Sequence, residues 1–234
     1  MIDNQINFDD FANTYTKLVN ASGKGLLGGK AEYFSEYKID ILKRILSNKN
    51  YRILDFGCGI GNSFSFFNKY FKDSEIVGTD VSEESLILAR KKYHNKFYVF
   101  DDDFVRSNNE KFDVIFISCV FHHIDRKEHA STLESLYQML VSDGVIIMFE
   151  HNKLNPITLR SVNNCEFDKG AILFESAYAK RIFNEAGFLK IRLNYCTFSP
   201  PFLSFLKPIE RFLNWCILGG QYYVVAEKRC GYFK

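Results

Sequence analysis

The feature that most constrains this chain is a set of alternating glycines directly after a short apolar run. The stretch from Asp55 to Gly61 has a glycine at every second position and follows the apolar pair Ile53-Leu54. Glycine adopts positive φ without strain and lets the backbone approach a ligand closely. A helix that starts near Gly61 would direct its unpaired N–H groups at the same place. The pattern predicts a strand, a tight turn and a helix, with a nucleotide-like ligand lying across the turn.

Strands and helices alternate along the chain from residue 51 onward. Helical spacing of apolar residues predicts helices at 8–20, 31–47, 61–71, 82–92, 127–141 and 176–186. Apolar runs bounded by turn signals predict strands at 51–56, 75–80, 96–100, 112–118, 145–150, 188–195 and 221–227. We expect a turn at Ser142-Asp143-Gly144 and a loop around Asn155-Pro156. The alternation favours βαβ units and a parallel sheet.

Composition excludes several classes of protein. The 234 residues suit one α/β domain with an insertion, and no apolar run approaches the ~18–20 residues of a membrane span. The N-terminus lacks the pattern of a signal peptide, and the six cysteines form no C-x-x-C pair, so we expect a reduced, cytoplasmic protein without a zinc site. The net charge of the chain is only +2, so the composition does not indicate the strongly basic surface of a nucleic-acid-binding protein.

The glycine stretch resembles the first motif of class I S-adenosylmethionine (SAM) methyltransferases. The resemblance covers about residues 8–195 and is strongest at Leu54–Asn62, Gly78–Asp80, Phe112-Asp113 and Cys119–Ile124. It implies a Rossmann-like α/β fold, in which a seven-stranded, mostly parallel sheet has an antiparallel last strand and helices on both faces. It also implies SAM as the cofactor.

The resemblance divides the chain into parts of a single methyltransferase domain, residues 1–234. We expect an N-terminal helical cap at 1–47 and a SAM-binding core at 48–195. An aromatic insertion or lid at 196–220 would precede the last strand and tail at 221–234. The lid is expected because the segment is rich in Phe, Pro and Leu and would flank the rim where the methyl group is transferred.

Ligands of open α/β sheets bind beyond the carboxyl ends of the strands, and five of the predicted strand ends carry suitable groups. Asp80 is expected to accept hydrogen bonds from the ribose hydroxyls. Asp101 or Asp102 would accept from the adenine amino group, with Val81 and Phe104 packed on the ring. The complete set expected to bind the cofactor is Tyr15, Asp55, Phe56, Gly57, Cys58, Gly59, Asp80, Val81, Asp101, Asp102, Phe104, Ser118 and Cys119.

The catalytic candidates are His122, His123, Glu150 and His151, which follow the fourth and fifth predicted strands. The segment Cys119–Ile124 resembles the region where the substrate of small-molecule methyltransferases faces the sulfonium methyl. A histidine there can take a proton from a hydroxyl group. Each histidine could instead cap a helix or pack inward, and Glu150 could simply hold the following loop.

Residues 149–156 resemble a subgroup with an E-H-N-P-x-N-P element after strand five, although Lys153 stands where its first proline would be. The acceptor expected from these features is a small polar metabolite or a sugar or cell-surface glycan intermediate, methylated on oxygen. A non-catalytic SAM-binding module and an N-methyltransferase of a small amine remain open. A metal site formed by the histidines is not expected, because adjacent histidines rarely converge on one ion.

Overall fold

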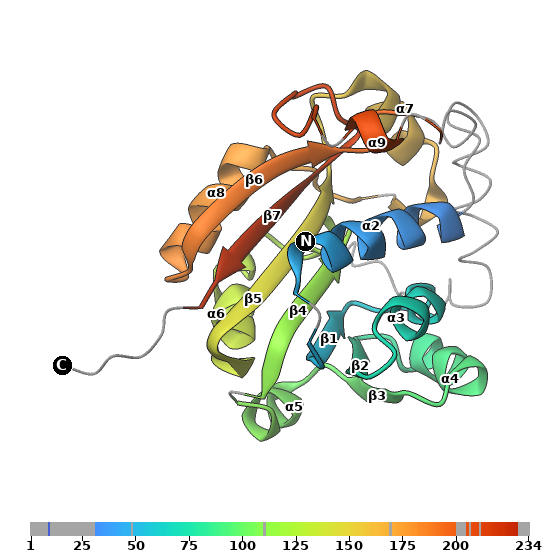
Figure 1. Ribbon diagram of the computed structural model, residues 1–234, viewed down its shortest axis with the longest axis vertical. Coiled ribbons are helices and arrows are strands. Elements are labelled where there is room, and N and C mark those ends of the chain that lie inside the picture. The colour runs from blue at the N-terminus through green and yellow to red at the C-terminus, as the bar shows by residue number, and fades with distance from the viewer. Residues whose placement is uncertain are drawn as a thin grey trace, which may run out of the picture.

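The computed structural model describes residues 9, 31–47, 49–109, 111–168, 170–199, 205, 207–210 and 212–228. Its sheet has the order β3-β2-β1-β4-β5-β7-β6 (Figure 1). The strands are β1 (Arg52–Phe56), β2 (Glu75–Asp80), β3 (Lys96–Val99), β4 (Phe112–Ser118), β5 (Leu140–His151), β6 (Leu189–Cys196) and β7 (Gln221–Glu227). Strands β1 to β5 are parallel, and β7 runs antiparallel to both β5 and β6. The predicted Rossmann-like sheet with an antiparallel last strand is confirmed.

Helices cover both faces of this sheet (Figure 1). One face packs against α2 (Ala31–Ile45), α3 (Phe64–Tyr70) and α4 (Glu83–Lys92). The other packs against α5 (Asp102–Ser107), α6 (His129–Met139) and α8 (Ser176–Glu185). Successive residues of β4 alternate between the two cores, with Val114 and Phe116 in the first and Ile115 and Ile117 in the second. This two-sided burial explains why β4 is continuously apolar.

The prediction that a turn at Ser142-Asp143-Gly144 precedes the fifth strand is wrong, because β5 already begins at Leu140. The strand pairs Leu140 with Phe112 and resumes regular pairing at Val145, with an irregularity between these points. Asp143 has a φ of 60° within it. The turn residues therefore form a bulge inside the strand rather than a connection before it.

Three short helices were not expected from the sequence. They are α5, α7 (Pro156–Asn163) and α9 (Lys207–Glu210). The start of α7 carries clear signals, because the Asn155 side chain accepts hydrogen bonds from the N–H groups of Ile157 and Thr158, and Pro156 occupies the first turn. Helix α7 matters for the site because it lies beyond the carboxyl end of β5.

The parallel strands bring all of their carboxyl ends to one edge of the sheet, where the predicted site residues gather. Apart from Asp9, the predicted helix at 8–20, with Tyr15, lies outside the described residues. Among the residues that are described, none forms a helix with the length and apolar character needed to cross a membrane.

Candidate active site

The glycine turn follows β1 and is held against β2. The N–H groups of Gly57 and Cys58 both donate to the Thr79 carbonyl, at 2.8 and 2.9 Å. Gly57 has a φ of 71°, and a Cβ atom there would lie 2.4 Å from a methyl carbon of Val120. Glycine is therefore required at position 57 both by the backbone conformation and by the close approach of the loop after β4.

Asp80 lies at the end of β2 and faces this turn. Its Oδ2 accepts from the Gly59 N–H at 2.7 Å, and its Oδ1 accepts from the Ser82 N–H at 3.0 Å. Burial raises the pKa of Asp80, and backbone hydrogen bonds from Ser82, Gly59 and Val81 partly oppose this effect. Each carboxylate oxygen can accept a further hydrogen bond, so Asp80 is positioned by the turn and retains capacity for ribose hydroxyls.

Asp55 is the most deeply buried acid of the turn, with 2% of its surface exposed. Its Oδ2 is buried and has no hydrogen-bond donor among the described residues. Burial and the neighbouring Asp80 raise the pKa of Asp55, while Lys38 opposes them. A buried carboxylate oxygen without a donor is costly. The amino and sulfonium groups of SAM offer a donor and a positive charge, so this orphaned oxygen fits the expected cofactor.

The residues expected around adenine occupy different environments. Asp101 caps α5 by accepting from the Phe104 N–H at 2.7 Å, and Asp102 is exposed in the first turn of that helix. The Phe104 ring is 7% exposed and packs in the core, whereas the Val81 side chain is 65% exposed. Phe56 is also a core residue. Of this group, Val81 and the two aspartates remain at the surface, where they could meet a ligand.

Lys38 is a site residue that the sequence reasoning missed. It is 5% exposed, and its Nζ donates to Ser118 Oγ at 2.8 Å and to Cys119 Sγ at 3.1 Å. Gln221 Nε2 donates to the same sulfur at 3.2 Å and lies 3.5 Å from His151 Nδ1. Burial alone would raise the pKa of the Cys119 thiol, but Lys38 and His151 lower it to about 6. Helix α2 thus supplies a buried cation beneath the end of β4.

We expect alkylation of Cys119 by iodoacetamide to rise with pH around a midpoint near 6, because the thiolate is the nucleophile and forms as the thiol titrates. Replacing Lys38 with Met removes the cation and should move this midpoint upward by at least ~1 pH unit. Peptide mass spectrometry separates Cys119 from the other cysteines, and Lys43→Met on the same helix is the matched control. An identical midpoint in Lys38→Met would contradict the assignment.

His122 and Glu150 form a buried pair. The Glu150 Oε2 accepts from His122 Nδ1 at 2.6 Å, while its Oε1 accepts from the N–H groups of Val120 and Phe121 at 3.1 and 2.8 Å. Burial alone would lower the pKa of His122, but Glu150 and Asp168 outweigh it and raise the pKa to about 10. The pKa of Glu150 is lowered, because the His122 charge outweighs burial. Glu150 therefore fixes both the loop after β4 and the orientation of one imidazole.

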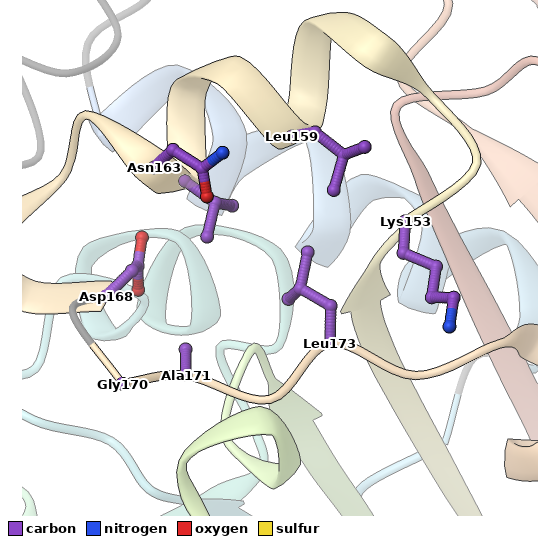
Figure 2. A pocket seen from close by; sticks show the side chains of 8 residues that line it. Lys153, Leu159, Asn163, Asp168, Gly170, Ala171 and Leu173 are labelled. Atoms are coloured by element: carbon purple, nitrogen blue, oxygen red, sulfur yellow. The ribbon is translucent and has the colours of Figure 1, made fainter.

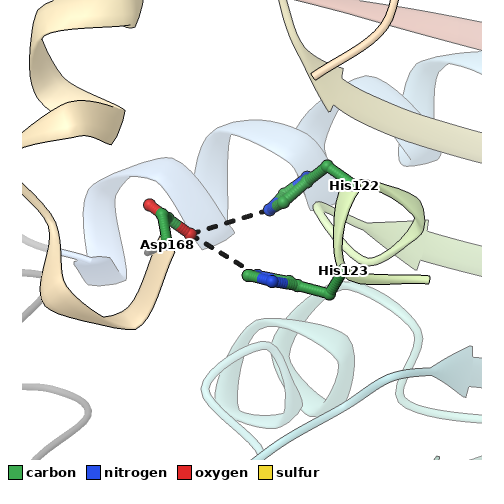
Figure 3. Close-up of side chains that lie close together, drawn as sticks. All are labelled: His122, His123 and Asp168. Atoms are coloured by element: carbon green, nitrogen blue, oxygen red, sulfur yellow. Dashed lines mark ion pairs between the residues drawn. The ribbon is translucent and has the colours of Figure 1, made fainter. Parts of the chain in front are cut away.

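Asp168 is the second site residue that the sequence reasoning missed. Its Oδ1 lies 3.7 Å from His122 Nε2 and 3.4 Å from His123 Nε2 (Figure 3). Burial lowers the pKa of His123, although Asp168 opposes this effect. The two imidazoles lower the pKa of Asp168 against the effect of its own burial. We call His122, His123 and Asp168 the polar wall.

Asp168 also lines a cavity of about 630 Å³ beside the polar wall (Figure 2). Helix α7 forms one side of this cavity, and residues 170–173 form the opposite side (Figure 2). Small-molecule sites have volumes of about 300–1,000 Å³. The lining combines polar and apolar side chains, including Lys153, Asn163, Asp168, Leu159, Val162 and Leu173.

Several known proteins are similar to this chain in sequence or in fold. A family model described as a methyltransferase domain matches residues 54–146. An uncharacterized methyltransferase of Bacillus pumilus is 27% identical over 193 residues, which cover 77% of this chain and 87% of the relative. A malonyl-[acyl-carrier protein] O-methyltransferase of Bacillus cereus is 26% identical over 144 residues, which cover 61% of this chain and 47% of the relative.

A solved structure from Thermotoga maritima, described as a SAM-dependent methyltransferase and possible histamine N-methyltransferase, matches with a TM-score of 0.68 at 19% identity. The match covers 95% of this chain and 98% of the other. The family model and these relatives show that the chain is similar to methyltransferases, and the sheet order and the structural match show that it has the fold of class I SAM-dependent methyltransferases. SAM, the cofactor that the resemblance implied, is named in the description of that solved structure.

Proposed function

We propose that the protein transfers the methyl group of SAM to an oxygen atom of a small polar metabolite, such as a sugar or glycan intermediate. The observation that carries this proposal is the cavity beside the polar wall, because Asp168 belongs to both. An acceptor in the cavity would present its reacting atom to the imidazoles. The name of the Bacillus cereus relative, an O-methyltransferase, supports oxygen as the acceptor atom.

Methyl transfer is an in-line displacement at the sulfonium methyl. A lone pair of the acceptor oxygen forms the new bond to carbon, and the carbon–sulfur bond breaks with its electron pair left on sulfur, which gives S-adenosylhomocysteine. A neutral hydroxyl must also lose its proton as the bond forms. The protein contributes alignment of the two reactants and, through the polar wall, promotes this proton loss.

The catalytic candidates occupy distinct parts of this arrangement. His122 and His123 belong to the polar wall, and Glu150 orients His122 through Nδ1. The His151 ring lies 5.1 Å from the His122 ring, between the polar wall and the cluster around Cys119. We infer that His123 and Asp168 act closest to the acceptor, and that Glu150 acts as a positioning residue.

The proposal is tested by incubating the protein and methyl-labelled SAM with metabolite extracts and with defined sugars, followed by mass spectrometry of the products. We expect a labelled O-methyl product. In His123→Ala, kcat should fall by about 10²–10⁴ with SAM affinity unchanged, because the wall acts in the chemical step. His94→Ala, an exposed histidine on the α4–β3 connection, is the control. Full activity of His123→Ala, or label found only on nitrogen, would overturn the proposal.

A further inference from the structure

The donor atoms of the polar wall converge on one point (Figure 3). One donor atom each from His122, His123 and Asp168 lies within 4.8 Å of the other two. The two histidines are adjacent in sequence, yet their ring centroids are 4.2 Å apart with 51° between the ring planes. The 3₁₀ turn η2 (Phe121–His123) produces this geometry, and the 3₁₀ turn η3 (Glu166–Asp168) supplies the carboxylate from the opposite side.

The distances within the polar wall suit a shared ion better than direct hydrogen bonds. The Asp168 oxygen lies 3.4 and 3.7 Å from the two imidazole nitrogens. An N–H···O hydrogen bond usually spans about 2.7–3.2 Å. Two ligands of a tetrahedral zinc ion, each bound at about 2.0–2.1 Å, lie roughly 3.3 Å apart. A cation between the three atoms would therefore need only small adjustments of the side chains.

His122 is oriented by a carboxylate, as metal-binding histidines usually are. Its Nδ1 donates to Glu150 Oε2 at 2.6 Å, so that Nε2 faces Asp168, and an ion bound there would displace the proton on Nε2. Metal-binding histidines commonly donate their second ring nitrogen to a carboxylate in this way. His129 Nε2 contacts the carbonyl oxygens of Phe121 and Ile124 at 2.9 and 3.1 Å, and so braces the backbone of η2.

The segment that carries Asp168 is tied to the same turn. The Ile172 N–H donates to the His122 carbonyl at 2.8 Å, and the Phe167 ring lies 5.2 Å from the His123 ring. Asp168 itself has only 13% of its side chain exposed. The three donors are thus preorganised by contacts to backbone and neighbouring side chains, which reduces the entropic cost of binding an ion.

We propose that His122, His123 and Asp168 bind a divalent transition-metal ion of the Zn²⁺, Mn²⁺ or Fe²⁺ type. Two imidazoles and one carboxylate are a donor set that these ions favour, and three protein ligands leave further positions open. This replaces the expectation of no metal site. In so far as it concerns catalysis, the inference rests on the proposed function: an acceptor oxygen from the cavity would take an open position, where the ion lowers the pKa of its hydroxyl and the proton passes to water.

The test uses the full chain, dialysed against a chelator and titrated with Co²⁺ as a spectroscopic probe. We expect one equivalent to bind, with visible absorption bands from the ion. Asp168→Asn and His123→Gln should each weaken Co²⁺ binding at least ~10-fold, and Glu150→Gln about 10–100-fold. The exposed control variants His94→Gln and Asp73→Asn should bind as the wild type does. Circular dichroism shows whether each variant is folded.

The outcomes separate this inference from the proposed function. Absence of Co²⁺ binding to the wild type, or equal affinity in folded Asp168→Asn and wild type, would overturn the metal site, whereas methyl transfer to oxygen could still be observed. Conversely, Co²⁺ binding that depends on Asp168, without any O-methylated product, would support the metal site and overturn the proposed function.

Discussion

Replacing Asp80 with Ala should weaken SAM binding by about a hundredfold or more. The carboxylate is expected to accept two hydrogen bonds from the ribose hydroxyls, and each charge-assisted bond contributes about 1.5–3 kcal/mol. Since about 1.4 kcal/mol corresponds to a tenfold change in Kd, losing both gives at least this effect. The substitution also removes the partner of the Gly59 N–H and so loosens the glycine turn. Titration calorimetry with SAM measures the change.

Two further variants sharpen this experiment. Asp80→Asn keeps one acceptor oxygen but no charge, so its affinity for SAM should lie between those of the wild type and Asp80→Ala. Asp73→Ala removes an exposed carboxylate at the opposite end of β2 and should leave the affinity unchanged. If folded Asp80→Ala binds SAM as tightly as the wild type, Asp80 has no role in holding the cofactor.

Replacing Glu150 with Ala should cost about 3–5 kcal/mol of unfolding free energy, which is the usual effect of removing one partner from a buried charged pair. Three donors lose their acceptor at once: the N–H groups of Val120 and Phe121 and the Nδ1 of His122. In a chain of this size, each kcal/mol lowers the melting temperature by about 2–4 °C, so a fall of roughly 6–20 °C is expected. Calorimetry or circular dichroism during heating measures it.

Glu150→Gln is the informative comparison for this prediction. Its remaining oxygen can still accept from the two backbone N–H groups, whereas its amide nitrogen would face the donor on His122. We therefore expect a smaller loss of stability than in Glu150→Ala. Glu134→Ala, a change on the exposed surface of α6, is the control. Equal melting temperatures for Glu150→Ala and the wild type would show that this carboxylate does not support the loop.

The sequence is informative about the fold where local signals and tertiary context agree. The apolar run of β4 and the glycines after β1 predict a buried strand and a tight turn, and both are present. Periodicity alone indicates only the alternation of strands and helices, and the place of the last strand came from the resemblance. The start of β5 was misjudged because Asp143-Gly144 carries a turn signal that the ladder accommodates as a bulge.

Lys38 could have been found from the sequence, because it interrupts the apolar stripe of α2. It lies four residues after Phe34 and three and four residues before Ile41 and Leu42, on the face that packs against the sheet. A lysine on such a face must find a partner for its charge, and Cys119 and Ser118 provide it.

Asp168 offered no comparable signal. It lies in η3, 45 residues after His123, and only the folded chain brings the two side chains together. A metal site was not expected because adjacent histidines rarely converge on one ion and no acidic residue stands at ligand spacing from them in the sequence. In η2 the tight turn and the hydrogen bond from His122 to Glu150 direct both rings to the same side. Contacts of this kind depend on tertiary packing, which spacing along the chain does not encode.

The position of β7 in the sheet also determines the order in which the protein can be completed during synthesis. Within the described sheet, β6 pairs with β7 and not with β5, although β6 leaves the ribosome first. The edge of β5 that pairs with β7, and β6 itself, therefore have no partner strand in the sheet until residues 221–227 have been synthesised. Exposed strand edges promote association between chains. The nascent protein should depend most on chaperones in the interval between the synthesis of these two strands.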